Sequence, residues 1–427
     1  MQEFIVNAPI QTRQNSLHKH ERLLSFLSAE ALNKIAEFQT GSQLPRVDLW
    51  NTVGTKSEKD WAEANAIQPI SYVDYHHQQI QSRYDILENY GIDRSARKVL
   101  TDGGEQYCEI VRDNIRKRVD NGDFVVKKEK FTHCEPCDYI VAPVGAGIDK
   151  CPVCHEENLD QVETEGLFTS IDDKKRREII DNTDIHPEMV RKSLRRTVLT
   201  MSDSIQLSKQ RQVGIRLSEF GIDEKFVLDP KISLAMMGRV VKEMGLGQIK
   251  AFVQGVDSVG NLAPYVYIAD PEGQYSYVNI GLVPTFNKDI LNDKNKPFYS
   301  TYLPLIMMSH PNGIDVQQRL NIFKEFNRTC GQYRYVTSSV NELLTNETVE
   351  VDRGLQFSNQ EIFGLFNQYK IQEGLTQIRQ FIYEGLSRDY LNCCRNNGTV
   401  PQTKALKQLK DVFSLTYNFK KGVKLSH

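Results

Sequence analysis

The chain has 427 residues, a hydrophobic fraction of 40% and a formal net charge of -2. This length leaves room for two or three domains with ample core, and the near-neutral charge gives no overall basic field that would attract DNA. No apolar signal segment opens the chain and no apolar run approaches the roughly eighteen residues of a membrane span, so we expect a cytoplasmic protein without a membrane partner.

The first part of the chain alternates strands and helices. An apolar strand at residues 4–6 precedes a helix at residues 20–38, whose apolar residues recur at helical spacing, and a second strand follows at residues 47–50. Further helices are expected at residues 75–90 and 104–119. Ligands bind at the loops that follow the carboxyl ends of strands in open parallel sheets, so the polar loops after these strands are the first candidates for a site.

Four cysteines form two C-x-x-C pairs, Cys134-Glu-Pro-Cys137 and Cys151-Pro-Val-Cys154. Two thiolates separated by two residues bind one ion from a tight turn, and two such turns complete a tetrahedral zinc site. Four thiolates leave no open coordination position, so the zinc ion would be structural. The alternative is that four cysteines fall at this spacing by chance. His76-His77 lies in a polar helical stretch without a partner ligand at a suitable spacing, and we expect it to be exposed rather than metal-bound.

The second half of the chain returns to alternating helices and strands, with strands expected at residues 249–253 and 265–269. The tail is mainly helical, with periodic stretches near residues 315–327, 359–369 and 373–390. The expected fold class is therefore α/β. We divide it into a first sheet half at 1–125, a zinc-knuckle insertion at 126–165, a second sheet half at 166–310, and a helical C-terminal region at 311–427.

Several short segments, in a fixed order between residues 4 and 285, match the motifs of one enzyme family. They are Phe4-Ile5-Val6-Asn7-Ala8-Pro9-Ile10, Gly54-Thr55, Tyr75-His76-His77, the two cysteine pairs, Glu163–Phe168, Leu207–Gln210 with Val213–Ile215, Val227–Pro230, and Gly255-Val256-Asp257. These segments resemble the first strand and T-T-P-I turn, the G-T-D-E-H-G loop, the Y-H-x-x-I helix, the zinc knuckle, and the E-T-E-H-x-F, I-S-R-D-L-x-W-G-I, W-F-D-A-P and G-K-D stretches of the methionyl-tRNA synthetases.

The resemblance implies the Rossmann-like catalytic domain of a class I aminoacyl-tRNA synthetase, with ATP, Mg²⁺ and an amino acid as ligands and tRNA or another molecule as acceptor. Counted without a gap, His18 falls on the first histidine of the family's H-I-G-H motif, which implies a catalytic and ATP-binding role. Gly255 and Asp257 are the other implied ATP contacts, with Asp257 at the ribose hydroxyls. Lys288 is nearest the expected K-M-S-K-S lysines, with Lys294 and Lys296 as alternatives. The implied substrate contacts are Ala8, Pro9, Lys56 and Asp229.

Three motifs depart from the family pattern. The H-I-G-H turn reads His18-Lys19-His20-Glu21, Lys56 replaces the aspartate that holds the substrate ammonium, and the K-M-S-K-S loop is missing. Three functions follow as alternatives: an active methionyl-tRNA synthetase, an ATP-dependent ligase that activates another amino acid as its adenylate, and a non-catalytic relative that binds RNA or a protein partner. Basic clusters at residues 174–177 and 191–196 are either solvated helix faces or contacts to an RNA backbone.

Overall fold

The computed structural model describes residues 2–12, 20–88, 92–95, 97–144, 147–148, 150–151, 154–273, 275–279 and 359–390, with short pieces between 328 and 338 and between 392 and 396. None of the helices in this part of the chain combines the length and the apolar character needed to cross a lipid bilayer.

A parallel sheet forms the centre of the molecule. Its strands run in the order β1 (Glu3–Asn7), β12 (Gln248–Gln254), β13 (Ser276–Asn279) and β8 (Asp184–His186), and every neighbouring pair is parallel. All but the first residue of β1 is buried, and β12 ends in a run of four buried residues. Such near-continuous burial is typical of parallel strands, which are covered on both faces.

A second set of parallel strands continues from the first. After β1, Ala8 and Pro9 lead into β2 (Ile10–Gln11), which pairs with β3 (Val47–Asn51), and β3 pairs with β4 (Lys98–Thr101). Across both sets the strands therefore lie in the order β4, β3, then β2 together with β1, then β12, β13 and β8. The direction in which strands are added reverses between β1 and β12, which is where ligands bind in doubly wound folds.

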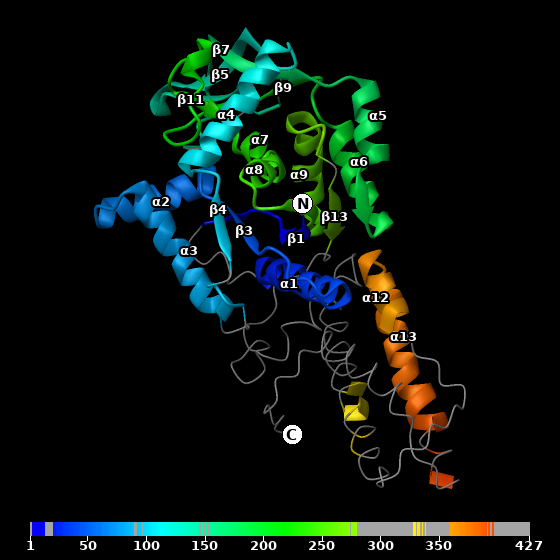
Figure 1. Ribbon diagram of the computed structural model, residues 1–427. Helices are drawn as coiled ribbons and strands as arrows, with labels where there is room; N and C mark the ends of the chain where they lie inside the picture. The colour runs from blue at the N-terminus through cyan, green and yellow to red at the C-terminus, as the bar shows by residue number, and fades with distance from the viewer. Residues whose placement is uncertain are drawn as a thin grey trace.

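Helices cover both sides of these strands (Figure 1). Helix α1 (His20–Thr40) packs against β1 and β12, while α8 (Met237–Glu243) packs against β12 and α9 (Val256–Ala269) against β13. Figure 1 shows α1 on one side of β1 and β3, and α8 and α9 on the other. In α1 the buried residues Leu27, Ala31 and Ile35 recur every four positions, which gives one apolar face for the sheet.

The strand predicted at residues 265–269 is wrong, because this segment is the last part of helix α9. Its buried residues Val259, Leu262, Ala263 and Val266 follow helical rather than alternating spacing. Residues 265–269 are only five apolar residues, too few to show either a helical or an alternating period. In the sequence, Pro264 also resembles a helix end, although it lies inside α9. The strand predicted at residues 249–253 is confirmed as β12.

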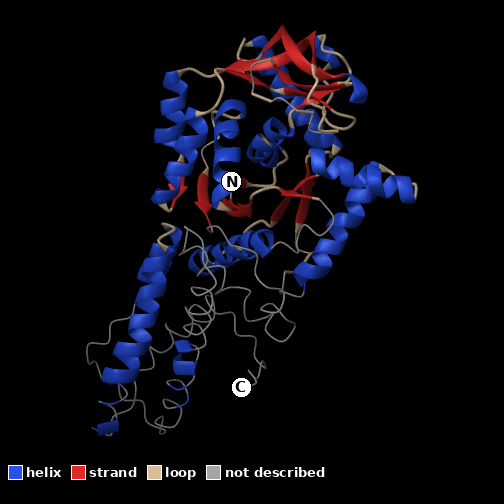
Figure 2. Cartoon of the chain, turned by 180° about the vertical axis from the view of Figure 1, so that it is seen from behind, coloured by secondary structure: helices blue, strands red, loops and turns tan. Residues whose placement is uncertain are grey.

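An antiparallel lobe lies on the side of the parallel strands opposite α1, beyond α8 and α9 (Figure 1). It contains β5 (Val125–Cys134), β6 (Tyr139–Pro143), β7 (Asp160–Ser170) and β9 (Ser204–Gln206) in the order β6, β5, β7, β9. The short hairpin of β10 (Ser208–Gln210) and β11 (Phe226–Leu228) packs against β6 and β7. Figure 2 shows this lobe at the top and the parallel strands at the centre. Helix α4 (Glu105–Asp120) and α7 (Pro230–Ala235) lie between the two layers (Figure 1).

Two helices of the C-terminal region are described. Helix α12 (Asn359–Asn367) is followed by α13 (Ile371–Gln380), which continues as a π-helical segment over Phe381–Tyr390. These helices confirm the helical prediction for residues 359–369 and 373–390, whereas the stretch predicted at 315–327 lies outside the described residues. Helix α12 packs against α1, with a ring contact between Phe363 and Phe38.

Candidate functional site

Buried amide side chains lie at the carboxyl ends of the central strands. Asn7 ends β1, Gln254 ends β12 and Asn279 ends β13, and each is at most 1% exposed. Gln254 is in register with Asn279. Neither amide atom of Gln254, nor the Oδ1 atom of Asn279, makes a hydrogen bond in the part of the chain that is described. Because a buried polar group without a partner costs about 1–3 kcal/mol, these atoms are suited to bind a polar ligand.

The amino end of helix α9 lies directly beside Gln254. Gly255 is its N-cap residue and has no side chain with which to cap the first turn. A Cβ atom at Gly255 would meet none of the described residues within 4 Å, so these residues leave the space next to this backbone open. The free amide N–H groups of a helix amino end attract anions, and here the helix has 14 residues. Of Asp257, in the first turn, the structure describes the backbone alone.

The loop after β3 is held by a buried carboxylate. Asp102, which follows β4, accepts hydrogen bonds from Thr52 N (2.6 Å), Thr52 Oγ1 (2.8 Å) and Val53 N (3.3 Å). Burial raises the pKa of Asp102 to about 6, although the hydrogen bonds from Thr52 oppose this rise. A Cβ atom at Gly103 would lie 2.9 Å from Thr52 Oγ1, so this close approach requires glycine. The loop leads into α2 (Thr55–Ile67). Lys56 lies in this helix, and the structure describes only its backbone.

A buried histidine stands next to this loop. His76 belongs to α3 (Tyr72–Glu88), is 3% exposed and has its Nδ1 atom 2.6 Å from Thr12 Oγ1. Burial, with a smaller effect of Arg83, lowers the pKa of His76 to about 4, so the ring is neutral at pH 7. Its Nε2 atom has no hydrogen-bond partner among the described residues. The prediction of exposure is confirmed for His77 but wrong for His76, because His76 and Ile80 lie on the face of α3 that is buried.

Several predicted site residues meet at the switch point of the sheet. Ala8 and Pro9 join β1 to β2, and Ala8 N donates to Val253 O (2.8 Å), one residue before Gln254. Ala8, Pro9 and Gly255 therefore share one edge. Asp229 caps α7, with its carboxylate accepting from Lys231 N (2.9 Å) and facing Lys209 Nζ at 3.6 Å.

His18 and Lys288, the two predicted catalytic residues, lie outside the described residues, and their roles remain predictions. Gln254, Asp102 and His76 were not predicted as site residues. Each follows or faces a strand end, but the sequence alone carried no sign that their side chains are buried.

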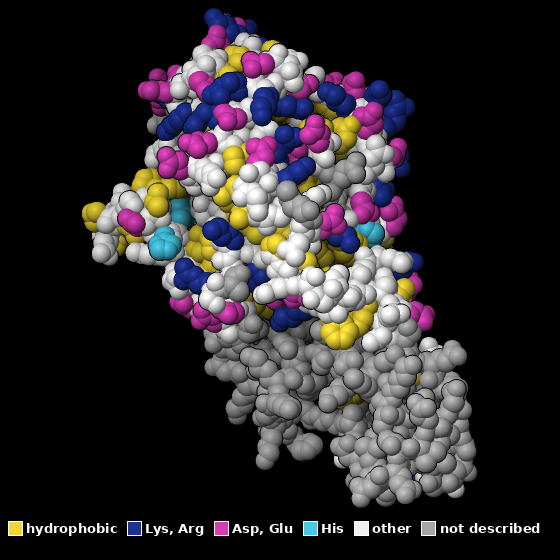
Figure 3. All heavy atoms as spheres, in the orientation of Figure 1, with side chains coloured by type: hydrophobic (Ala, Val, Ile, Leu, Met, Phe, Trp, Pro, Cys, Tyr) yellow, Lys and Arg dark blue, Asp and Glu magenta, His cyan; other side chains and the backbone are white. Residues whose placement is uncertain are grey.

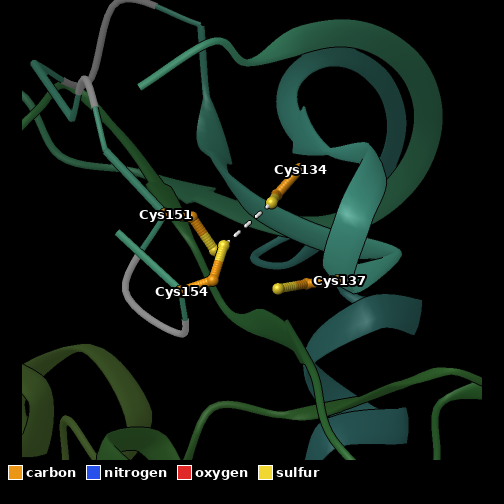
Figure 4. A group of neighbouring side chains, drawn as sticks. All are labelled: Cys134, Cys137, Cys151 and Cys154. Atoms are coloured by element: carbon orange, nitrogen blue, oxygen red, sulfur yellow. Dashed lines mark hydrogen bonds between the residues drawn. The ribbon is translucent and has the colours of Figure 1, made fainter. Parts of the chain in front are cut away.

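The four cysteines predicted to bind zinc come together (Figure 4). Their Sγ atoms all lie within 4.8 Å of one another, and the Sγ atoms of Cys134 and Cys154 are 3.5 Å apart. A tetrahedral zinc ion with Zn–S bonds of about 2.3 Å needs sulfur atoms about 3.8 Å apart, whereas a disulfide needs about 2.05 Å. All four cysteines are free thiols. The group therefore fits a zinc ion, held by Cys134, Cys137, Cys151 and Cys154.

The residue after each cysteine pair has the same unusual backbone conformation. The residue after each pair, Asp138 or His155, has a left-handed conformation with φ of 44° or 66°. Asp138 N donates to Glu135 O, and His155 N donates to Cys151 O, which closes each turn. Such a turn brings both thiols of a pair to one side, so the backbone itself prepares the tetrahedral set.

The thiols also influence one another electrostatically. The backbone N–H of Glu156 lowers the pKa of Cys154 to about 7, and the neighbouring Cys154 raises the pKa of Cys137 to about 12. Four thiolates in this space would repel one another, and a divalent cation removes that repulsion. Zinc bound here would contribute to the folding of the antiparallel lobe.

Comparison with known proteins gives matches in structure alone. No family model and no curated protein sequence matches the chain. Methionyl-tRNA synthetase of Mycobacterium tuberculosis bound to methionyl-adenylate has a TM-score of 0.64 at 11% identity, over 97% of this chain and 89% of that one. A second structure of that complex gives a TM-score of 0.64 at 11% identity, with 97% and 88% covered. The free form of the enzyme gives 0.59 at 11% identity, with 97% and 87% covered.

These similarities show the fold. The chain has the α/β architecture expected from its sequence, with a parallel Rossmann-like sheet, helices and a four-cysteine knuckle, and its structural neighbours are methionyl-tRNA synthetases.

Proposed function

We propose that the chain is a synthetase-like ligase that binds ATP with Mg²⁺ and activates an amino acid as its adenylate. One observation carries the proposal: the unpaired amide of Gln254 and the open amino end of α9 lie together where the strand order reverses. In this reaction the amino-acid carboxylate attacks the α-phosphorus of ATP, an acyl-phosphate bond forms, and pyrophosphate leaves. The activated acyl group would then pass to tRNA or to another acceptor.

Each predicted residue takes a role in this proposal. The amide N–H groups that follow Gly255 would approach a phosphate or ribose oxygen, and Asp257 would accept hydrogen bonds from the ribose hydroxyls. His18 and Lys288 would stabilise the charge that develops on the phosphates. The proposed substrate contacts are Ala8, Pro9, Lys56 and Asp229. The zinc ion supplies structure and takes no part in the reaction.

The decisive experiment is pyrophosphate exchange with ATP and each amino acid in turn, repeated with tRNA present. The Gly255→Ala variant provides a sharp test, because its methyl group would enter space that the fold leaves open but that the ligand would occupy. We expect weaker ATP binding, by about tenfold or more, with unchanged thermal stability. Gly364→Ala is the matched control, since a Cβ atom there also meets no described residue within 4 Å and Gly364 lies in α12.

The outcome with His18→Ala separates a ligase from a binding protein. Exchange with one amino acid that is lost in His18→Ala would establish the ligase and name its substrate. If the folded wild-type protein with zinc neither binds ATP nor catalyses exchange, with or without tRNA, the proposal is wrong.

A second function, the binding of RNA without catalysis, is favoured by one surface feature. Helices α5 (Asp173–Asn182) and α6 (Arg191–Leu199) pack together and carry exposed cations, interspersed with carboxylates, over one part of the surface (Figure 3). The exposed cations are Lys174, Lys175, Arg177, Lys192, Arg195 and Arg196. RNA binding that weakens steeply with salt, and that Arg195→Gln with Arg196→Gln reduces, would support this function in a protein that does not bind ATP.

A further inference from the structure

Solvent reaches the four cysteines of the knuckle to different degrees. Cys134 and Cys151 are 0% exposed, Cys137 is half-buried, and Cys154 is exposed. A thiol that solvent reaches is also open to small oxidants, and susceptibility to oxidation follows exposure and thiolate character. A cysteine that binds zinc has lost its proton, so all four sulfur atoms have thiolate character in the loaded protein. Exposure therefore makes Cys154 the first of the four that an oxidant meets.

The sulfur atom of Cys154 faces a second cysteine across the knuckle (Figure 4). Its Sγ atom lies 3.5 Å from Sγ of Cys134. A disulfide has a length of about 2.05 Å, so a movement of about 1.5 Å closes the gap. Cys134 ends β5 and pairs with Tyr139 of β6, which fixes its position in the antiparallel sheet. Cys154 belongs to a turn, and turns open more readily than paired strands, so Cys154 can approach Cys134.

We infer that the knuckle is a peroxide-sensitive switch, in which Cys154 is the oxidation site, Cys134 is the resolving cysteine, and zinc is released when the two join. In the first step the Cys154 thiolate attacks hydrogen peroxide; an S–O bond forms, the O–O bond breaks, and hydroxide leaves. In the second step the Cys134 thiolate attacks the oxidised sulfur; an S–S bond forms, the S–O bond breaks, and a second hydroxide leaves. The two thiolates lose two electrons, and the peroxide gains them.

The disulfide removes two of the four zinc ligands. Cys137 and Cys151 alone do not complete a tetrahedral set of thiolates, so the ion leaves. Because structural zinc contributes to folding, the antiparallel lobe becomes less stable when the ion is lost. A reducing thiol that breaks the disulfide restores all four ligands, and the knuckle then takes up zinc again. This switch is independent of the proposed adenylate chemistry.

Cys108 offers a comparison within the same chain. It is a half-buried free thiol of α4 that does not belong to the knuckle. Burial, with a smaller effect of Asp102, raises the pKa of Cys108 to about 11, so its thiol stays protonated at pH 7. The protonated thiol is a poor nucleophile, and we expect Cys108 to react with peroxide later than Cys154.

The test exposes the zinc-loaded full chain to excess hydrogen peroxide and follows free zinc with a chromogenic chelator. We expect release of the bound zinc, recovery of the site with dithiothreitol and added zinc, and a Cys134–Cys154 disulfide in the peptide map by mass spectrometry. Cys154→His and Cys137→His are the matched variants, because three thiolates and one imidazole also bind zinc. Only Cys137→His keeps both reacting cysteines, so Cys154→His should release zinc about tenfold more slowly, or slower still. Cys108→Ser should behave as wild type.

Three results would overturn the inference. The first is a wild-type protein that keeps its zinc until Cys108 is oxidised. The second is a disulfide within one C-x-x-C pair, in place of the one between Cys134 and Cys154. The third is release of zinc from Cys154→His as fast as from Cys137→His. Should Cys154→His not bind zinc, timed alkylation of the wild type decides, because Cys154 must then be the first knuckle cysteine that peroxide protects from the alkylating reagent.

Discussion

Replacing Asp102 by asparagine should change how stability depends on pH. The side chain of Asp102 is 1% exposed, and its Oδ1 atom accepts all three hydrogen bonds from Thr52 and Val53. Its Oδ2 atom has no hydrogen-bond partner among the described residues. In Asp102→Asn the amide oxygen can accept the same three bonds, so the variant removes the charge and keeps the local geometry.

The magnitude follows from the shifted pKa. Burial raises the pKa of Asp102 from 3.8 to about 6, a change of about 2.2 pH units. At about 1.36 kcal/mol for each unit, this is about 3 kcal/mol. Because the folded pKa is the higher one, the folded state binds more protons between these values. The stabilising contribution is therefore complete below pH 3.8, falls as the pH rises through 6, and is gone above it. Between pH 5 and 7.5 the wild type should lose about 1.4 kcal/mol from this group.

Urea unfolding at pH 5, 6 and 7.5 measures this difference. Trp50 is buried in β3, two residues before Thr52, so its fluorescence reports the domain that contains Asp102. The free energy of unfolding of Asp102→Asn, relative to wild type, should rise by about 1.4 kcal/mol from pH 5 to pH 7.5. Asp120→Asn, which removes an exposed carboxylate of α4, gives the background. Parallel pH profiles for wild type and Asp102→Asn would refute the reasoning.

Three further changes test other parts of the structure. Cys151→Ser should lose the bound zinc, as mass spectrometry of the purified protein would show, and should lower the melting temperature of the antiparallel lobe; full retention of the metal would contradict the four-thiolate site. Arg97→Leu should cost about 3–5 kcal/mol in urea unfolding, because it leaves the fully buried Asp48 without its two charged bonds of 2.6 and 2.7 Å. A cost below about 1 kcal/mol would mean that Asp48 finds other partners. Gly214→Ala should destabilise by about 1–3 kcal/mol, since φ is +134° and the new Cβ atom would lie 2.9 Å from Val227 Cγ2. An unchanged melting temperature would show that the hairpin relaxes around it.

Local patterns predicted the elements that are strongly periodic or apolar. The strands at residues 4–6, 47–50 and 249–253 are confirmed as β1, β3 and β12, and the helix at 20–38 is confirmed as α1. These predictions succeeded because parallel strands are buried on both faces and a surface helix is buried on one face. Each therefore gives a simple pattern of hydrophobic residues in the sequence. The four-cysteine cluster was equally readable, because the spacing of ligands along the chain determines the turn that presents them.

The candidate site was much harder to predict, for a physical reason. Gln254 and Asp102 are ordinary polar residues that follow apolar strands, and their burial depends on helices and a lobe from distant parts of the chain. His76 was misjudged because the polar character of α3 hides the side of the helix that packs inward. The resemblance to a family located Ala8, Pro9 and Gly255 at one edge, which local patterns alone would not have done.

The contact between α1 and α12 has a mechanical consequence. Helix α1 starts at His20, and its far end carries Phe38, whose ring lies 5.2 Å from that of Phe363 in α12. With 21 residues, α1 is about 31 Å long. Gln39, at the same end, also bonds to Asn367. Because α1 is one continuous helix that packs both on the sheet and on α12, it fixes the distance between the sheet and the C-terminal helices.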